Sequence, residues 1–297
     1  MSIIFRTYNP APLFGEDYIK LRNFLIKLDS HIYHFGRWDW MITHSYLDIN
    51  GLDKIGLWED SGELVAAATY DCQLGDAYLL VHEGYRHLGE DMLLYAKSAL
   101  ANDGKFRVVI LDGDLEMQDT AYRNGFIATQ DNGSDAVFPI GDPDIIRYSL
   151  PEGFRLIGLE ENPSAYEVGR VMWNGFNHEA NGEGPFSPSP DDLESVERQL
   201  HRPNVDLTLK IAVVAPDGHF ASFCGMWYDA ACGSALVEPV ATDPAYRNMG
   251  LGKAAVLEGI RRCGKLGAKR AFVGSSQQFY YSIGFRPLAT STFWEMK

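Results

Sequence analysis

The hydrophobic and polar positions in the second half of the chain predict a strand, a turn and a long helix, in that order. Residues 236–242 form a mostly apolar run that is typical of a buried strand. Residues 254–266 carry apolar side chains at helical spacing, and Gly267 ends the pattern. The residues between them, 246–254, include one arginine and two glycines. These glycines therefore lie at a helix N-terminus, where unpaired N–H groups and the positive end of the helix dipole favour a phosphate.

Three kinds of phosphate-binding loop have glycines at such a place, and the flanking residues separate them. A P-loop requires a Ser or Thr directly after its Gly-Lys pair, where this chain has Ala254. The dinucleotide-binding fingerprint is only half matched, because no ribose-binding acid follows the next strand. What remains is an Arg-x-x-Gly-x-Gly pattern formed by Arg247, Gly250 and Gly252. The lack of a Cβ at both glycines predicts that phosphate oxygens approach the main chain there.

A second motif follows at residues 275–285, with the sequence Ser-Ser-Gln-Gln-Phe-Tyr-Tyr-Ser-Ile-Gly-Phe. Its serines favour the start of a short helix, and Gly284 favours its end. The two motifs in this order resemble those of the GNAT superfamily of acyl-CoA-dependent N-acetyltransferases, in which the loop holds the cofactor pyrophosphate. The resemblance implies acetyl-CoA as co-substrate, and it implies that Tyr280 reaches the CoA sulfur. The alternative is that Tyr280 and Tyr281 only fill the core.

The resemblance also implies which residues contact the cofactor. They come from the end of the strand, from the loop and from the start of the helix, and one serine follows the next strand. At that last place the family often has an asparagine, which this chain lacks. The candidates are Val240, Ala241, Thr242, Arg247, Asn248, Met249, Gly250, Leu251, Gly252, Lys253 and Ser275.

Glu238 is the candidate base of the reaction. A primary amine with a pKa of about 10.4 is protonated at pH 7, and freeing its lone pair costs roughly 4.6 kcal/mol. Strand alternation puts Glu238 on the face of Val240 and Thr242, where the family has its thioester. We expect Glu238 to accept the proton, directly or through water, a backbone N–H near Val240 to stabilise the oxyanion, and Tyr280 to protonate the thiolate. A buried Glu238 with a structural partner is the alternative.

Residues 177–186 form a polar loop that contains glycines and follows a predicted helix. In the family, the corresponding segment lines the acceptor cleft. Four residues in and before this loop are therefore candidates for substrate contact: Trp173, Phe176, His178 and Glu179. Trp173 and Phe176 are three positions apart, which is equally the spacing of core residues, so binding and packing both stay open for them.

The first half of the chain contains a degenerate copy of the same pattern. Arg86 and Gly89 recur as Arg247 and Gly250 at one constant offset, and earlier and later landmarks recur at slightly smaller offsets. A chain of 297 residues is also long enough for two ordinary domains. The sequence therefore predicts two tandem copies of one domain, in an arrangement that resembles that of mycothiol synthase.

The two copies differ at positions that carry chemistry. Asp91 replaces Gly252, and a carboxylate about 4 Å from a phosphate charge costs roughly 1 to 4 kcal/mol. Ala121 stands where the second copy has its tyrosine. We therefore predict a degenerate, non-catalytic domain over residues 1–143 and a catalytic domain over residues 144–297. The predicted fold class is α/β (α+β), with two tandem GNAT-like domains that each have a mixed, mostly antiparallel sheet flanked by helices.

Composition restricts the partners. The chain has 26 Lys and Arg against 40 Asp and Glu, and its net charge is −14. No dense basic stripe offers phosphate neutralisation, which argues against DNA or RNA, whereas a cationic acceptor would be attracted. The N-terminus has no signal pattern and no apolar run reaches 18 residues, so no membrane partner is predicted and the expected location is cytoplasmic. The cysteines and histidines lack metal-ligand spacing, so no metal is predicted.

The pattern as a whole favours an acetyltransferase that moves an acetyl group from acetyl-CoA to a primary amine of a small molecule, by direct attack in a ternary complex. One alternative is a non-catalytic acyl-CoA-binding or sensing protein, and another is a protein N-acetyltransferase. The presence of Glu238 and Tyr280 beside an intact loop favours the enzyme. The acceptor, the acyl-chain length and the oligomeric state stay open.

Overall fold

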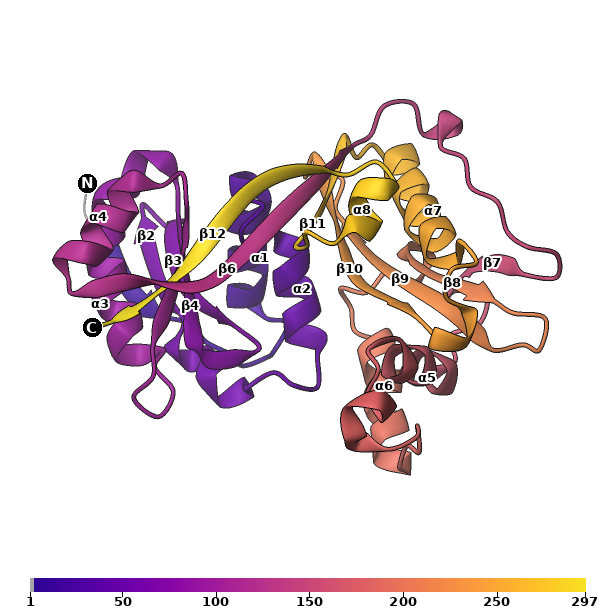
Figure 1. Cartoon of the computed structure of the whole chain (residues 1–297). Coiled ribbons are helices and arrows are strands. Elements are labelled where there is room, and N and C mark those ends of the chain that lie inside the picture. The colour runs from indigo at the N-terminus through magenta and orange to yellow at the C-terminus, as the bar shows by residue number, and fades with distance from the viewer. Residues whose placement is uncertain (1–2) are drawn as a thin grey trace. The chain divides into compact units, whose positions relative to one another are not determined.

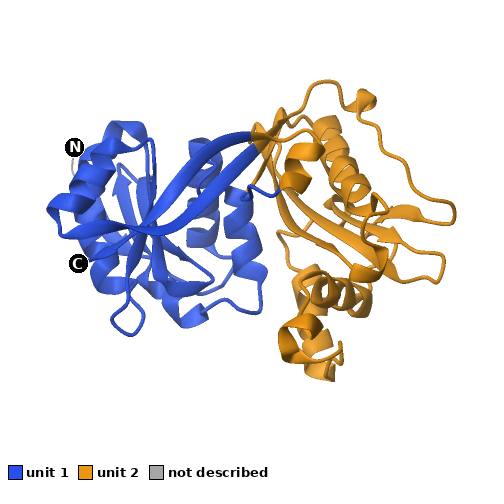
Figure 2. Ribbon diagram, in the orientation of Figure 1, with its two compact units in different colours: residues 1–136, 274–277, 287–297 blue, residues 137–273, 278–286 orange. Residues whose placement is uncertain are grey.

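The computed structural model describes residues 3–297, which divide into two compact units (Figure 2). Of the described residues, unit 1 comprises 3–136, 274–277 and 287–297, and unit 2 comprises 137–273 and 278–286. The division is not contiguous, because the end of the chain returns to unit 1. The sequence prediction has one boundary, at residue 143, and assigns the whole C-terminal end of the chain to the second domain.

Unit 2 contains a mixed sheet in the order β11-β10-β9-β8-β7. β10 and β11 are parallel, and the other neighbours are antiparallel. The strands are β7 (Arg155–Gly158), β8 (Lys210–Val214), β9 (Phe220–Tyr228), β10 (Ser234–Thr242) and β11 (Arg270–Val273) (Figure 1). The helices are α5 (Ala165–Gly175), α6 (Pro190–Leu200), α7 (Leu251–Leu266) and α8 (Gln278–Ser282), with short 3-10 or π turns at Pro143–Ile145, Glu179–Glu183, Leu207–Leu209 and Pro244–Tyr246.

Helices cover both faces of the unit 2 sheet. On one face, Gly259 of α7 lies so close to Met226 and Ile211 that a Cβ would come within 2.6 Å of Met226 Cγ. On the other face, Ala212 and Phe223 belong to a buried cluster that also contains residues of α5 and α6. Successive side chains of a strand point to opposite faces. The sheet therefore lies between α7 on one side and α5 with α6 on the other.

The central strand β10 has neighbours of unequal length. Its pairing with β11 ends at Leu236, whereas its pairing with β9 continues to Thr242. The two parallel strands therefore part after Leu236. Beyond this point, only one edge of β10 is paired within the unit 2 sheet.

A β-bulge interrupts β10 just after the strands part. Glu238 and Pro239 together oppose the single residue Gly225 of β9. A Cβ at Gly225 would come within 2.4 Å of the Glu238 carbonyl oxygen, so glycine is required there. The Trp227 indole N–H donates to the same oxygen at 2.8 Å. The expectation that simple alternation puts Glu238 on the face of Val240 is wrong, because the extra residue of the bulge breaks the alternation.

Unit 1 repeats this plan with its strands in the order β1-β2-β3-β4-β5-β12-β6. β4 and β5 are parallel, and β5 and β12 are antiparallel. The strands are β1 (Ile3–Thr7), β2 (Gly56–Asp60), β3 (Glu63–Asp71), β4 (Gln73–Val81), β5 (Arg107–Leu111), β6 (Phe126–Pro139) and β12 (Arg286–Met296). The helices are α1 (Glu16–Leu28), α2 (Phe35–Thr43), α3 (Gly89–Ala99) and α4 (Leu115–Arg123), with 3-10 turns at Ile49–Lys54 and Glu83–Leu88.

The closing strands of the two repeats are exchanged. Residues 291–295 of β12, the last strand of the chain, pair with β5 in unit 1. The end of β6, the last strand of the first repeat, belongs instead to unit 2, where the Ile140 N–H donates to the Lys269 carbonyl oxygen at 2.8 Å. Each copy keeps a mixed, mostly antiparallel sheet flanked by helices, as predicted. Among residues 3–297, no helix has the length and apolar character to cross a membrane.

A buried ion cluster holds the middle of α7. The Glu258 carboxylate is 4% exposed and accepts hydrogen bonds from Arg261 at 2.6 Å, Arg262 at 2.8 Å and the Tyr148 hydroxyl at 2.7 Å. Burial opposes ionisation, but these hydrogen bonds and charges outweigh it and lower the pKa of Glu258 from 4.5 to about 2. A carboxyl whose pKa falls on folding stabilises the folded state above its unfolded pKa, and that contribution is lost as the pH falls through the folded value.

We predict that Glu258→Gln lowers the free energy of unfolding by about 3 kcal/mol at pH 7, the equivalent of this pKa shift. The difference from the wild type should shrink between pH 4.5 and about 2, where the wild type loses its ionised carboxylate. Urea unfolding followed by circular dichroism at several pH values measures both. Glu194→Gln, which removes a pair with Arg198 from a carboxylate 68% exposed, is the control and should cost under about 0.5 kcal/mol. Equal losses in both variants at pH 7 would contradict the prediction.

Candidate functional site

The parting of β10 from β11 frees one edge of β10. The Asp243 N–H donates to the Ala221 carbonyl oxygen of β9 at 3.0 Å. Because antiparallel pairing alternates, the N–H groups of Val240 and Thr242 point away from β9, toward the side that β11 has left. A ligand in this opening therefore meets backbone donors of β10.

The loop after β10 exposes further backbone N–H groups. Asn248 and Gly250 both have left-handed backbone conformations, with φ values of 62° and 79°. Gly250 precedes the first residue of α7 and provides no side-chain cap. The first turn of α7, Leu-Gly-Lys-Ala, carries no acidic residue. Its own side chains therefore leave the positive end of the helix dipole uncompensated, as an anion site requires.

The two glycines of the motif are required for different reasons. A Cβ at Gly250 would meet open space, so its left-handed conformation alone favours glycine. A Cβ at Gly252 would come within 2.9 Å of Thr242 Oγ1 and 3.5 Å of the Phe279 ring. The sequence predicts one role for both, the approach of phosphate oxygens. At Gly252, which is buried, the close neighbour is instead the protein itself, and glycine lets α7 pack on β10.

The Arg247 side chain is held by neutral partners. Its Nε donates to the Thr242 carbonyl oxygen at 3.2 Å, and its Nη2 donates to the Gly175 carbonyl oxygen at 2.9 Å and to Asn177 Oδ1 at 2.8 Å. Within the described part of the chain, Arg247 forms no ion pair with a carboxylate. Three neutral acceptors thus orient the guanidinium while its positive charge stays available to a ligand.

Asp243, which is absent from the sequence predictions, attaches α5 to the end of β10. Its buried carboxylate accepts hydrogen bonds from Arg170 Nη1 and Asn174 Nδ2, both at 2.8 Å. Burial raises the pKa of Asp243, but hydrogen bonds, with that from Asn174 the strongest, lower it by more. Gly175 allows the close contact, because a Cβ there would come within 2.7 Å of Ala241 Cβ. The end of α5, where the acceptor candidates begin, is therefore fixed against the strand.

Tyr280 lies on α8 with its side chain only 8% exposed. The rings of Phe279 and Phe285 have centroids 5.0 and 5.4 Å from that of Tyr280. Burial, together with the nearby Cys224 and Glu238, raises the pKa of the Tyr280 phenol well above its ordinary value. The hydroxyl therefore stays protonated at neutral pH, and it makes no hydrogen bond within residues 3–297.

The acceptor candidates divide into a stacked pair and two exposed residues. The Trp173 and His178 rings stack with centroids 4.4 Å apart. His178 Nδ1 lies 2.7 Å from Glu183 Oε1, which orients the imidazole. Phe176 is 48% exposed, and Glu179 is also exposed. The structure thus brings Trp173 and His178 together and leaves the other two open to solvent.

The remaining cofactor candidates have different environments. Met249 and Lys253 are exposed, whereas Leu251 is 1% exposed and offers only its main chain to a ligand. Ser275 belongs to unit 1, and its hydroxyl accepts a hydrogen bond from the Gln277 N–H at 3.2 Å. The serine therefore forms a turn before α8.

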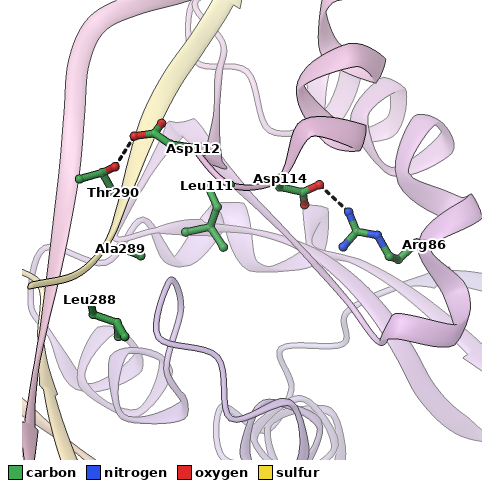
Figure 3. Close-up of a pocket in the computed structure, with 8 residues that line it drawn as sticks. Arg86, Leu111, Asp112, Asp114, Leu288, Ala289 and Thr290 are labelled. Atoms are coloured by element: carbon green, nitrogen blue, oxygen red, sulfur yellow. Dashed lines mark hydrogen bonds and ion pairs between the residues drawn. The ribbon is translucent and has the colours of Figure 1, made fainter.

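In unit 1 the counterpart of Arg247 is neutralised within the protein. Arg86 Nη2 lies 2.5 Å from Asp114, and its Nε lies 2.8 Å from Glu116. Arg86 and Asp114 line a cavity of about 590 Å³. Figure 3 shows their ion pair. Asp112 of the same cavity accepts hydrogen bonds from two threonines of β12. The carboxylates of this cavity are therefore engaged by other residues of unit 1.

The loop and strand of unit 1 also differ from those of unit 2. Gly89 has a right-handed conformation, with φ −53°, so the preceding turn continues directly into α3. Two acidic residues in the first turn of α3 already offset the positive N-terminal end of its helix dipole. In β4, Leu80 alone stands where β10 has the bulge residues Glu238 and Pro239. The non-catalytic role of the first copy stays a prediction.

The second copy matches a protein family over most of its length. A model of the acetyltransferase (GNAT) family matches residues 173–285. This segment is therefore similar in sequence to the GNAT acetyltransferase family. It begins at the acceptor candidate Trp173 and includes the bulge, the loop after β10 and Tyr280.

Solved structures extend the similarity to the whole chain. A tandem GNAT protein from the clavulanic acid biosynthesis pathway has a TM-score of 0.60 at 12% identity, covering 99% of this chain and 98% of its own. A GCN5-related N-acetyltransferase from Sphaerobacter thermophilus has a TM-score of 0.58 at 16% identity, covering 99% and 95%. A GNAT-family acetyltransferase from Colwellia psychrerythraea has a TM-score of 0.54 at 12% identity, covering all of both chains. No curated protein matches the sequence.

At these identities the likeness shows the fold, and it confirms the predicted fold class of two tandem GNAT-like domains. The arrangement shared with mycothiol synthase stays a resemblance. The roles of the individual site residues stay predictions.

The two glycines of the GNAT loop should respond differently to alanine. Gly252→Ala brings a Cβ to 2.9 Å from Thr242 Oγ1 and should lower the free energy of unfolding by about 1 to 2 kcal/mol. Gly250→Ala should cost about 1 kcal/mol because of its left-handed φ. Adding Thr242→Ala, which removes Oγ1, should recover most of the loss at Gly252 and none at Gly250. Urea unfolding of both double-mutant cycles measures the coupling, and equal coupling of the two glycines to Thr242 would refute this assignment.

Proposed function

We propose that unit 2 transfers an acetyl group from acetyl-CoA to a primary amine of a small-molecule acceptor, by direct attack in a ternary complex. The observation that carries the proposal is the uncompensated charge of Arg247 beside the acid-free N-terminus of α7, next to the free edge of β10. A thioester that bears a pyrophosphate fits this combination. The charge and the helix N-terminus favour the phosphates, and the strand edge offers N–H groups to an arm that contains amides.

In this proposal, the pyrophosphate binds the N–H groups of the loop, with Arg247 and Lys253 supplying positive charge. The pantetheine arm adds along the free edge of β10 as an extra strand would, with Val240 and Thr242 as donors. This path leads the thioester toward the neighbourhood of Tyr280. The proposal is supported because the charge of Arg247, the N-terminus of α7 and the free edge of β10 lie on consecutive parts of the chain.

The reaction requires a neutral amine, which costs roughly 4.6 kcal/mol for an amine of pKa near 10.4 at pH 7. Glu238 is the carboxylate that raises the pKa of Tyr280, and it is partly buried on the bulge. We assign it the role of proton acceptor, directly or through water. Attack forms the N–C bond at the thioester carbon, and a β10 backbone N–H, with Val240 the first candidate, stabilises the charge on the oxygen.

Collapse of the tetrahedral intermediate breaks the C–S bond and leaves a thiolate. Tyr280 offers a protonated hydroxyl that has no other hydrogen-bond partner among the described residues. Its raised pKa lies well above that of a thiol, about 8.5, so complete proton transfer from Tyr280 is unfavourable. We therefore assign Tyr280 a hydrogen bond to the departing sulfur. The proton that the amine loses accounts for the one that converts the thiolate to the free thiol.

The acceptor that these features favour is a small cationic amine. The net charge of −14 attracts cations. The stacked Trp173 and His178, with the carboxylates of Glu179 and Glu183 near them in sequence, offer aromatic and acidic groups that suit an ammonium.

Acetyl-CoA should bind once per chain in a calorimetric titration. Gly252→Asp should remove the site, because its side chain meets Thr242 and its charge repels phosphate. Asp91→Gly is the matched change in unit 1 and should add no second site, since Arg86 keeps its acidic partners. Two sites in the wild type would overturn the prediction that unit 1 binds no acetyl-CoA. No binding in the wild type would overturn both the enzyme and the sensor.

Tyr280→Phe should lower the rate of acetyl transfer roughly tenfold to several hundredfold while the Kd for acetyl-CoA changes little, because the lost hydroxyl acts on the departing sulfur. The assay follows release of the CoA thiol in the presence of a panel of small primary amines. A wild-type rate in the variant removes Tyr280 from the mechanism. Tight binding without amine-stimulated turnover across the panel favours the sensing protein instead.

A further inference from the structure

We propose that Asn177 is a positioning residue for the cofactor. Its side-chain amide orients Arg247 for the pyrophosphate without neutralising it, and its main chain begins the acceptor loop, defined as residues 177–184. This inference rests on the proposed function, because it takes the pyrophosphate of CoA as the ligand of Arg247.

The hydrogen bonds of Arg247 define the role of Asn177. Arg247 Nη2 donates to Asn177 Oδ1 at 2.8 Å and to the Gly175 carbonyl oxygen at 2.9 Å, so both of its hydrogens are used. Nε donates to Thr242. Nη1 has no hydrogen-bond partner within residues 3–297. The guanidinium is thus fixed on two of its nitrogens and keeps the donors of the third for a ligand.

The main chain of Asn177 connects this arginine to the acceptor loop. Asn177 has φ 61°, a left-handed conformation that asparagine tolerates better than most residues. Its carbonyl oxygen accepts a hydrogen bond from the Asn181 N–H at 2.9 Å. This bond begins the turn that carries Glu183 to His178. A change in the position of Arg247 therefore acts directly on the first residue of the acceptor loop.

The absence of charge on Asn177 is as important as its hydrogen bond. In unit 1, Arg86 has the carboxylates of Asp114 and Glu116 at comparable distances, 2.5 and 2.8 Å. A carboxylate at position 177 would neutralise Arg247 in the same way and compete with the pyrophosphate. Aspartate has nearly the shape of asparagine, so Asn177→Asp tests the charge alone. Asn177→Gly keeps the left-handed conformation and tests the loss of the side chain.

The experiment is a calorimetric titration of the full chain and both variants with CoA at several salt concentrations, with melting temperatures measured in parallel. Asn177→Asp should raise the Kd for CoA about tenfold or more at low salt, because an ion pair replaces a neutral contact at Arg247. Asn177→Gly should raise it only about two- to fivefold. The salt dependence of binding should be shallower for Asn177→Asp than for the wild type, since one cation no longer serves the phosphates.

Three results would overturn the inference. Equal CoA affinity and equal salt dependence in the wild type and Asn177→Asp would show that Arg247 is not governed by this residue. Parallel losses in both variants with lowered melting temperatures and an unchanged salt slope would show a purely structural role. Failure of the wild type to bind CoA would overturn the proposed function, and with it this inference, so the two failures are distinguishable.

Discussion

The loss of pairing between β10 and β11 after Leu236 is the constraint on which the rest of unit 2 depends. A strand that keeps only one neighbour offers its free N–H groups to a ligand, but it needs other support. The bulge provides part of it, because Gly225 lets the backbone of β9 lie close and Trp227 donates to the bulge carbonyl. At the end of the strand, Asp243 and Gly175 attach α5. The part of β10 beside the opening is therefore held by the neighbouring strand β9 and, at its end, by α5.

The two copies differ more in the charges around the arginine and the helix N-terminus than in the order of their strands and helices. Both copies have a parallel strand pair, an arginine after the strand and a helix that follows it. Arg247 has only neutral partners and α7 begins without an acid, whereas Arg86 has two carboxylate partners and α3 begins with two acids. An anion site requires positive charge that the protein has not already neutralised. In unit 1 the charge of Arg86 is already neutralised by Asp114 and Glu116.

The parts of unit 2 that depend on local sequence were predictable. The strand, the loop and the helix follow from hydrophobic spacing and from the positions of the glycines, and Tyr280 follows from a motif. The face of Glu238 did not follow, because a bulge depends on how two strands pair. The changing offset between the repeats was its only trace, since the bulge adds one residue to β10 relative to β4. Asp243 was missed because an aspartate before a proline is ordinary turn chemistry, and its partners Arg170 and Asn174 lie about 70 positions away.

The exchange of closing strands could not be predicted for a related reason. An alternating strand pattern reads the same whichever sheet the strand joins. After α8 and the turn at Gly284, the chain enters β12, which lies between β5 and β6 in the sheet and pairs with β5 of unit 1 over residues 291–295. Phe138, at the end of the first repeat's closing strand, packs on Phe285 with centroids 5.5 Å apart.

The segment that follows Tyr280 is thus held by closing strands of both repeats. Without β5, β12 would have one free edge, and its N–H and C=O groups would be open to other chains there. Without β6, Phe285 and the turn at Gly284 would lose the Phe138 ring, which lies within 2.8 Å of a Cβ position at Gly284. The closing strand of the first repeat thus supplies a ring, Phe138, to the turn after Tyr280 inside unit 2.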